Sequence, residues 1–172
     1  GKPHTPLLFS DGTERVASIF VNGAGTVVDD ISGNAYAGTV QGGAGWITTA
    51  IGPALALTGA GHHVTYPVAS GVCRTGPRHT VMVWFERTGH ASANMTLWSE
   101  VGATNAIYKV VLASAAATTT VQVFIRKADN TVLLDQTTAT APVATGLIHT
   151  MTLVDDNGAV TLYIDGVSVL TA

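Results

Sequence analysis

The chain has 172 residues, a formal net charge of −3, 47% hydrophobic residues and only 11% charged ones. This length suffices for one domain with a sizeable core, and such an apolar composition argues against disorder. The eight Lys and Arg residues are scattered and form no basic stripe, so we expect no nucleic-acid partner, and no apolar run reaches the length of a membrane span.

The beginning of the chain differs from the rest. Residues 1–6 contain two prolines and little apolar content, so they cannot form a core by themselves. We predict an N-terminal arm over residues 1–15, either a frayed end or an extended arm laid on a neighbour. Residues 16–172 are predicted to form a single domain.

Apolar residues recur with a period of two along most of the chain, which indicates strands. Ala, Thr, Val and Gly supply more than half of all residues, a composition that suits strands and tight turns. The predicted strands are residues 16–21, 39–41, 54–57, 63–66, 80–85, 95–99, 107–112, 121–126, 131–135, 148–154 and 160–164. Residues 113–120 (ASAAATTT) are interpreted as a loop, because three consecutive Thr continue a helix poorly.

Two turn signals mark a β-meander at the C-terminal end. Asp155-Asp156-Asn157-Gly158 separates two predicted strands, and Asp165-Gly166 follows the second. Both sequences end in dipeptides that supply the positive φ angles of tight hairpins. Short strands with turn signals between them predict an all-β fold, an antiparallel sandwich or barrel.

Three stretches resemble laminin-G-like domains of the concanavalin A-like lectin and glucanase superfamily. Residues 28–67 contain a D-x-S-G-N turn, a Gly-rich segment ending in Gly-Trp and a G-x-A-L-x-L-x-G strand. Residues 80–89 (TVMVWFERTG) and the L-Y-x-D-G hairpin within residues 149–169 continue the likeness. The resemblance implies an antiparallel β-sandwich of the jelly-roll type.

The chain departs from that family after the L-Y-x-D-G hairpin. Relatives run on for a few dozen residues into a strand that pairs near the N-terminal strand, whereas this sequence stops at Ala172. Either that edge strand is missing, or residues before Val28 fill its place, or a neighbouring chain supplies it. An open sheet edge invites pairing with another chain, so a protein partner is expected.

Asp30 and Asn34 are the candidate metal ligands. A turn such as Asp30-Ile31-Ser32-Gly33-Asn34 offers carboxylate, amide and backbone oxygens together, which calcium prefers. Laminin-G-like relatives often hold calcium here with a further acidic ligand that this chain lacks. The alternative is an Asx turn closed by the Asp30 side chain. Any calcium would be structural, and no other cofactor is required.

No catalytic motif is visible, and we predict that the chain is not an enzyme. Glycosidases need two carboxylates flanking the scissile bond, and only Glu86 and Glu100 are conceivable partners across a sheet. No G-x-S-x-G elbow occurs. His62 and His63 are adjacent and would point to opposite faces of a strand, so zinc is disfavoured.

The aromatic residues and the lone cysteine are assigned to packing. Trp84 lies within an apolar strand and is predicted to pack between the sheets, and Trp46 is also predicted to be core. Cys73 has no partner within the chain and is interpreted as a small buried residue. A sugar-binding site on these aromatic residues is therefore possible but not indicated by any motif.

These observations favour a non-enzymatic structural or adhesive module displayed on a large assembly. The expected setting is a virion, as a phage capsid decoration or cement protein or a tail-associated protein, with a capsid shell protein or neighbouring copies as partners. The alternative is a secreted or surface lectin module that binds glycans with help from calcium. The expected location is the virion surface or the extracellular space.

Overall fold

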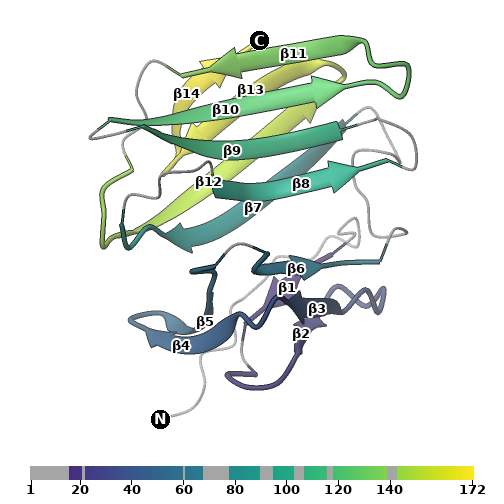
Figure 1. Cartoon of the computed structure of the whole chain (residues 1–172). Helices are drawn as coiled ribbons and strands as arrows, with labels where there is room; N and C mark the ends of the chain where they lie inside the picture. Colours follow the sequence, from purple (N-terminus) through teal and green to yellow (C-terminus); the bar gives the residue numbers. More distant parts are fainter. Residues whose placement is uncertain are drawn as a thin grey trace. The chain divides into compact units, whose positions relative to one another are not determined.

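A computed structural model of the chain describes residues 16–20, 22–59, 61–67, 78–89, 95–102, 107–115, 118–138 and 143–172. All regular elements within these ranges are β-strands, and all pairings between them are antiparallel (Figure 1). The all-β prediction is therefore confirmed. No helix that is long and apolar enough to cross a membrane occurs within the same ranges.

The chain divides into two compact units, Gly1–Val72 and Cys73–Ala172. The prediction of a single domain over residues 16–172 stays a prediction. The predicted arm over residues 1–15, together with Cys73, lies outside the described residues.

The first unit contains a four-stranded sheet and a two-stranded ribbon. The sheet has the order β1 (Ser18–Ile19), β2 (Val27–Asp30), β3 (Gly38–Gln41) and β6 (His63–Thr65), and the ribbon pairs β4 (Gly45–Thr49) with β5 (Gly52–Ala56). Val28 and Val40 are its buried apolar residues among those described. Trp46 on β4 is half-buried and donates its indole N–H to the carbonyl of Gly25 at 2.8 Å.

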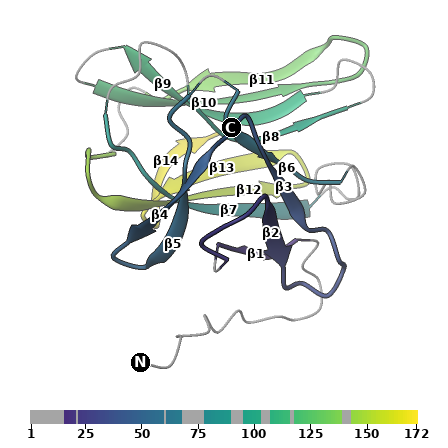
Figure 2. The ribbon, with the colours of Figure 1, turned by 60° about the horizontal axis from the view of Figure 1, so that its bottom comes forward.

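The second unit contains two four-stranded sheets. One has the order β11-β10-β9-β8 and the other the order β14-β13-β12-β7. The strands are β7 (Arg78–Glu86), β8 (Met95–Val101), β9 (Ile107–Ala115), β10 (Thr118–Arg126), β11 (Val132–Thr137), β12 (Ile148–Asp156), β13 (Ala159–Ile164) and β14 (Val167–Thr171). Figure 2 shows these two sheets as separate layers.

Alternating side chains from both sheets form one core. On β12 and β13 the buried residues occupy every second position, as the period of a half-buried strand requires. The core cluster joins residues of the two sheets: Tyr108, Val110, Leu112, Val121 and Val123 from β9 and β10, and Met151, Leu153, Val160, Leu162, Ile164 and Leu170 from β12, β13 and β14. The inner faces of the two sheets therefore pack together, which is consistent with a β-sandwich.

The predicted C-terminal meander is confirmed. Strands β12, β13 and β14 are joined by two tight turns in which Asn157 and Gly158 have φ angles of 58° and 93°, and Asp165 and Gly166 have φ angles of 51° and 78°. Positive φ at both central residues matches the right-handed twist of the flanking strands. Asn, Asp and Gly tolerate this conformation best, so the turn chemistry fixes both hairpins.

Four of the secondary-structure assignments differ from the sequence-based prediction. The prediction of a loop over residues 113–120 is wrong, since β9 continues to Ala115, β10 begins at Thr118, and these two residues pair. Residues 118–120 are all Thr, a β-branched residue that favours strands, which agrees with this extension of β10. The strands β2, β4 and β14 were not predicted, because each is short and adjoins a Gly-containing turn.

The core of the second unit provides a test of this fold. Leu162 is fully buried between the sheets, so Leu162→Ala should lower the free energy of unfolding by about 2–5 kcal/mol. Thr161→Ala changes the neighbouring position on the opposite face and should cost less than about 1 kcal/mol. Urea unfolding of both variants measures the difference, and equal losses would contradict the assigned faces.

Candidate functional site

The Asp30 carboxylate is the centre of the turn that follows β2. Its Oδ1 accepts hydrogen bonds from the backbone N–H groups of Ala17 at 3.0 Å and Ser32 at 2.9 Å. Its Oδ2 accepts from the Ser32 hydroxyl at 2.9 Å and from the backbone N–H of Tyr36 at 2.8 Å. The carboxylate thus joins the residue before β1, the end of β2 and the following loop.

The same contacts set the ionisation of Asp30. Desolvation by burial pushes its pKa upward, but the N–H donors of Ala17, Ser32 and Tyr36 together outweigh that effect. The pKa of Asp30 therefore lies below its ordinary value, because every donor favours the charged form. At neutral pH the group is an ionised carboxylate with four donors directed at it.

This arrangement is the Asx turn that the sequence offered as the alternative to a calcium site. Asn34 is exposed and turns its backbone N–H and its Nδ2 toward the Ser32 hydroxyl, at 3.2 Å and 3.3 Å. A cation at Asp30 would have to displace N–H donors whose positive ends face the same oxygens. As folded, the turn does not fit calcium well, and calcium binding by Asp30 and Asn34 stays a prediction.

A second carboxylate supports the C-terminal hairpins. Asp165 Oδ2 lies 2.6 Å from Nδ1 of the buried His149, and Oδ1 accepts from the Thr150 N–H at 2.7 Å. The hydrogen bond with His149 is the largest cause that lowers the pKa of Asp165. His149 Nε2 lies 3.1 Å from the carbonyl of Ala144, so both ring nitrogens face backbone or carboxylate oxygens. This pair ties β12 to the turn between β13 and β14.

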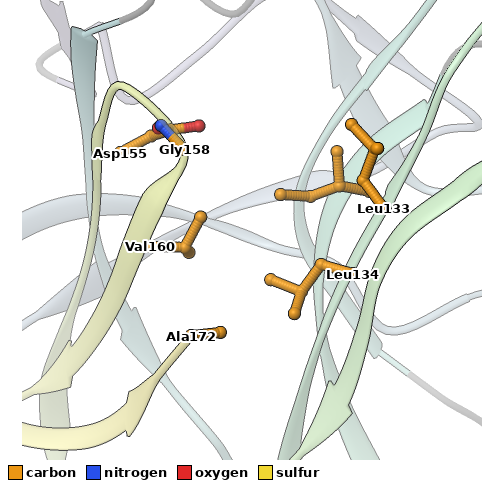
Figure 3. A pocket seen from close by; sticks show the side chains of 7 residues that line it. Leu133, Leu134, Asp155, Gly158, Val160 and Ala172 are labelled. Atoms are coloured by element: carbon orange, nitrogen blue, oxygen red, sulfur yellow. The ribbon is translucent and has the colours of Figure 1, made fainter.

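The cavity at one side of the second unit is apolar. It has a volume of about 150 Å³ and is lined by Ile125, Leu133, Leu134, Asp155, Gly158, Val160 and Ala172. Figure 3 shows Leu133 and Leu134 on one side and Val160 and Ala172 on the other. Its one ionisable side chain, Asp155, accepts from the Tyr108 hydroxyl at 3.1 Å and from the Gly158 N–H at 2.8 Å. The lining therefore offers packing surface and no acid–base pair.

The other residues singled out from the sequence lie on different strands and loops. Glu86 belongs to β7 and Glu100 to β8, and these strands belong to different sheets. His62 Nδ1 accepts from the N–H of Gly59 at 3.2 Å, and His63 Nδ1 lies 2.7 Å from the carbonyl of Gly61. Within the described part of the chain, no three His, Cys, Asp or Glu side chains are grouped to hold a metal.

The side of the β14-β13-β12-β7 sheet that points away from the core carries exposed apolar side chains. On β7 the inner positions are Val81, Val83 and Phe85, so Met82 and Trp84 point outward and are 52% and 57% exposed. The prediction that Trp84 packs between the sheets is wrong. The period of two decides this, because Trp84 lies between two residues that contact the core.

The neighbours of Trp84 on this outer face are mostly uncharged. The register places Thr150 opposite Trp84, Thr152 opposite Met82, and Tyr163 opposite Thr152. We call the set Met82, Trp84, Thr150, Thr152 and Tyr163 the outer face. Two large exposed apolar side chains and three hydroxyl groups thus lie side by side on this surface. The alternation along β7 already places Met82 and Trp84 on one face of the strand. The sequence of a single strand does not show whether that face points toward the core.

No family model, curated protein or solved structure matches the chain. The resemblance to laminin-G-like domains therefore stays a prediction based on the motifs.

The Asp30 turn predicts a specific pH dependence. The pKa of Asp30 is lowered in the folded protein, so its ionised carboxylate stabilises the fold above about pH 4, and this contribution is lost as the pH falls through the folded pKa. Asp30→Asn should lower the free energy of unfolding by about 1–3 kcal/mol at neutral pH. The amide NH2 of Asn would replace Oδ2, so the Tyr36 N–H and the Ser32 hydroxyl would lose their acceptor.

The neighbouring residue supplies the control. Asp29 is exposed and its side chain accepts from Asn22 at 3.2 Å, so Asp29→Asn should change the free energy of unfolding much less. Urea unfolding of both variants between about pH 3 and pH 7 measures the two effects. If Asp30→Asn kept the acid dependence of the original protein, the role assigned to this carboxylate would be wrong.

Proposed function

We propose that the protein is a non-enzymatic structural or adhesive module of a large assembly, and that it contacts a protein partner through the outer face. The observation that carries this proposal is the exposure of Met82 and Trp84 on strand β7. Burying large apolar side chains is the main favourable term in protein association, and Trp is a frequent anchor of interfaces.

The charge pattern supports a protein partner. The five residues of the outer face carry no charge, and Arg78 at the end of β7 on the same side already contacts Asp156 at 2.6 Å, so this surface offers no cluster of positive charge to a phosphate backbone. The carboxylates of Asp30, Asp155 and Asp165 each accept hydrogen bonds that hold turns or join strands. These three carboxylates therefore stabilise turns and strand contacts within the chain, as expected of a module with a structural role.

The setting that we propose is the surface of a virion, where the chain would decorate a capsid shell or belong to a tail. A capsid shell protein or neighbouring copies would be the partners. The finer fold assignment, a laminin-G-like jelly roll, belongs to the same proposal. It is supported by the facing antiparallel sheets of the second unit and by the hairpin at Asp165-Gly166, which the motif comparison indicated.

Fractionation of the native source on a density gradient tests the setting. Peptide mass spectrometry should find the chain with large particles, at a copy number comparable to that of a shell protein. Recovery of the chain as a free soluble protein would contradict the proposal.

Reattachment to stripped particles tests the surface. Trp84→Lys should reduce attachment by about tenfold or more, because a charge replaces an apolar anchor. Val132→Lys is the matched control, since Val132 is 51% exposed on β11 in the other sheet, and it should leave attachment unchanged. Equal attachment of both variants would exclude the outer face as the contact.

The exposed Trp84 also favours the alternative, a lectin module. An aromatic ring flanked by the hydroxyls of Thr150 and Thr152 can stack on one sugar ring and hydrogen-bond the next. A glycan panel with and without calcium tests this function. Binding that Trp84→Ala removes would support a lectin, and dependence on calcium and Asp30 would support the calcium site. No glycan binding in either condition would exclude the lectin module.

A further inference from the structure

Strand β7 lies at the edge of its sheet. It pairs with β12 on one side, and within the described residues no strand pairs with its other side. The strand is nine residues long and contains neither Pro nor Lys, the residues that often protect such edges. Its central side chains Met82 and Trp84 are exposed. Such an edge is suited to pairing with another strand.

The hydrogen-bond pattern shows which backbone groups face this edge. Asp165 donates its N–H to the carbonyl of Thr150, so even-numbered residues of β12 turn their backbone groups toward β13. The odd-numbered residues of β12 then face β7 and pair with Val81, Val83 and Phe85. The N–H and carbonyl groups of Thr80, Met82 and Trp84 consequently point to the open side.

The sequence of β7 is complementary to itself in the antiparallel direction. If Met82 is placed opposite Met82 of a second copy, Arg78 lies opposite Glu86 and Thr80 lies opposite Trp84. All these residues share the outer side of the strand, and in this register their outward backbone groups face each other as hydrogen-bonded pairs. Opposite charges that face each other across two strands stabilise the pair.

The other edge strands of the second unit lack this feature. The only charged residue of β8 is Glu100 and the only one of β11 is Asp135, while β14 has none. Arg78 already contacts Asp156 at 2.6 Å, but its side chain is 77% exposed and can reach a second carboxylate. Charge complementarity thus distinguishes β7 from the other edges.

We propose that β7 pairs with β7 of a second copy of this chain, so that two sheets join into one continuous sheet in a symmetric dimer. The two-fold axis passes between the Met82 residues and places two arginine–glutamate pairs at the ends of the contact. The outer faces of the two copies become one surface with both Trp84 side chains near its centre. This inference goes beyond the proposed function, since it concerns the purified chain without any shell protein.

Charge reversal tests this dimer. The purified protein should have a molar mass of about 35 kDa, twice 17.6 kDa, by light scattering after size-exclusion chromatography. Arg78→Glu or Glu86→Arg alone places like charges opposite each other at both ends and should weaken dimerisation by about tenfold or more. The double variant restores opposite charges in exchanged positions and should recover the dimer.

Two controls separate the loss of the β7 contact from unfolding and from a general effect of charge. Both charges are exposed, so the variants should unfold at similar urea concentrations to the original protein. Lys127→Glu reverses a charge between β10 and β11, away from β7, and should leave the dimer intact. A monomer at every concentration, or a dimer that neither single reversal weakens, would overturn the proposal. Failure of particle attachment with a dimer intact would overturn the proposed function alone.

Discussion

The second unit depends on one constraint, the strict alternation of buried and outward side chains along β12. His149, Met151 and Leu153 are withdrawn from water, and the residues between them lie on the outer side of the sheet. A slip of one residue in register would exchange the two sets, so that Thr150 and Thr152 would be buried and Met151 and Leu153 exposed. The neighbours β7 and β13 are held to the same alternation through their pairing with β12.

The turns maintain this register. Asp165 combines a positive φ angle with a carboxylate that bonds Thr150 and His149 at the start of β12, so the hairpin between β13 and β14 is tied back to its neighbour. Asp155 has the corresponding role at the other end, where it bonds Gly158 in its own turn and Tyr108 in the facing sheet. The Tyr108–Asp155 hydrogen bond therefore links the two layers as well as the turn.

Much of this arrangement could be predicted from local sequence. The dipeptides Asn157-Gly158 and Asp165-Gly166 locate the two hairpins, and the period of two locates most strands. The Asx turn at Asp30 was also one of the two predicted alternatives. Its donors Ala17 and Tyr36 could not be predicted, because the first is thirteen residues away and is brought near by pairing of β1 with β2.

Trp84 shows where sequence reasoning fails for the candidate site. An apolar strand that contains a Trp is ordinarily read as core, yet its neighbours Val83 and Phe85 occupy the inner side. Which side of a strand faces a second layer depends on the whole sheet, and a single strand does not contain that information. The same exposure of Trp84 and Met82 supports both the proposed contact surface and the proposed pairing of β7.

Amide hydrogen exchange along β7, followed by NMR at low and high protein concentration, tests the central claim of assembly through this strand most directly. The account predicts that Val81 and Val83 are protected at both concentrations by β12, whereas Thr80, Met82 and Trp84 become protected only at high concentration. Rapid exchange of Thr80, Met82 and Trp84 at every concentration would contradict it. Equal protection of all five amides in the dilute protein would also contradict it, because the edge would then be covered within one chain.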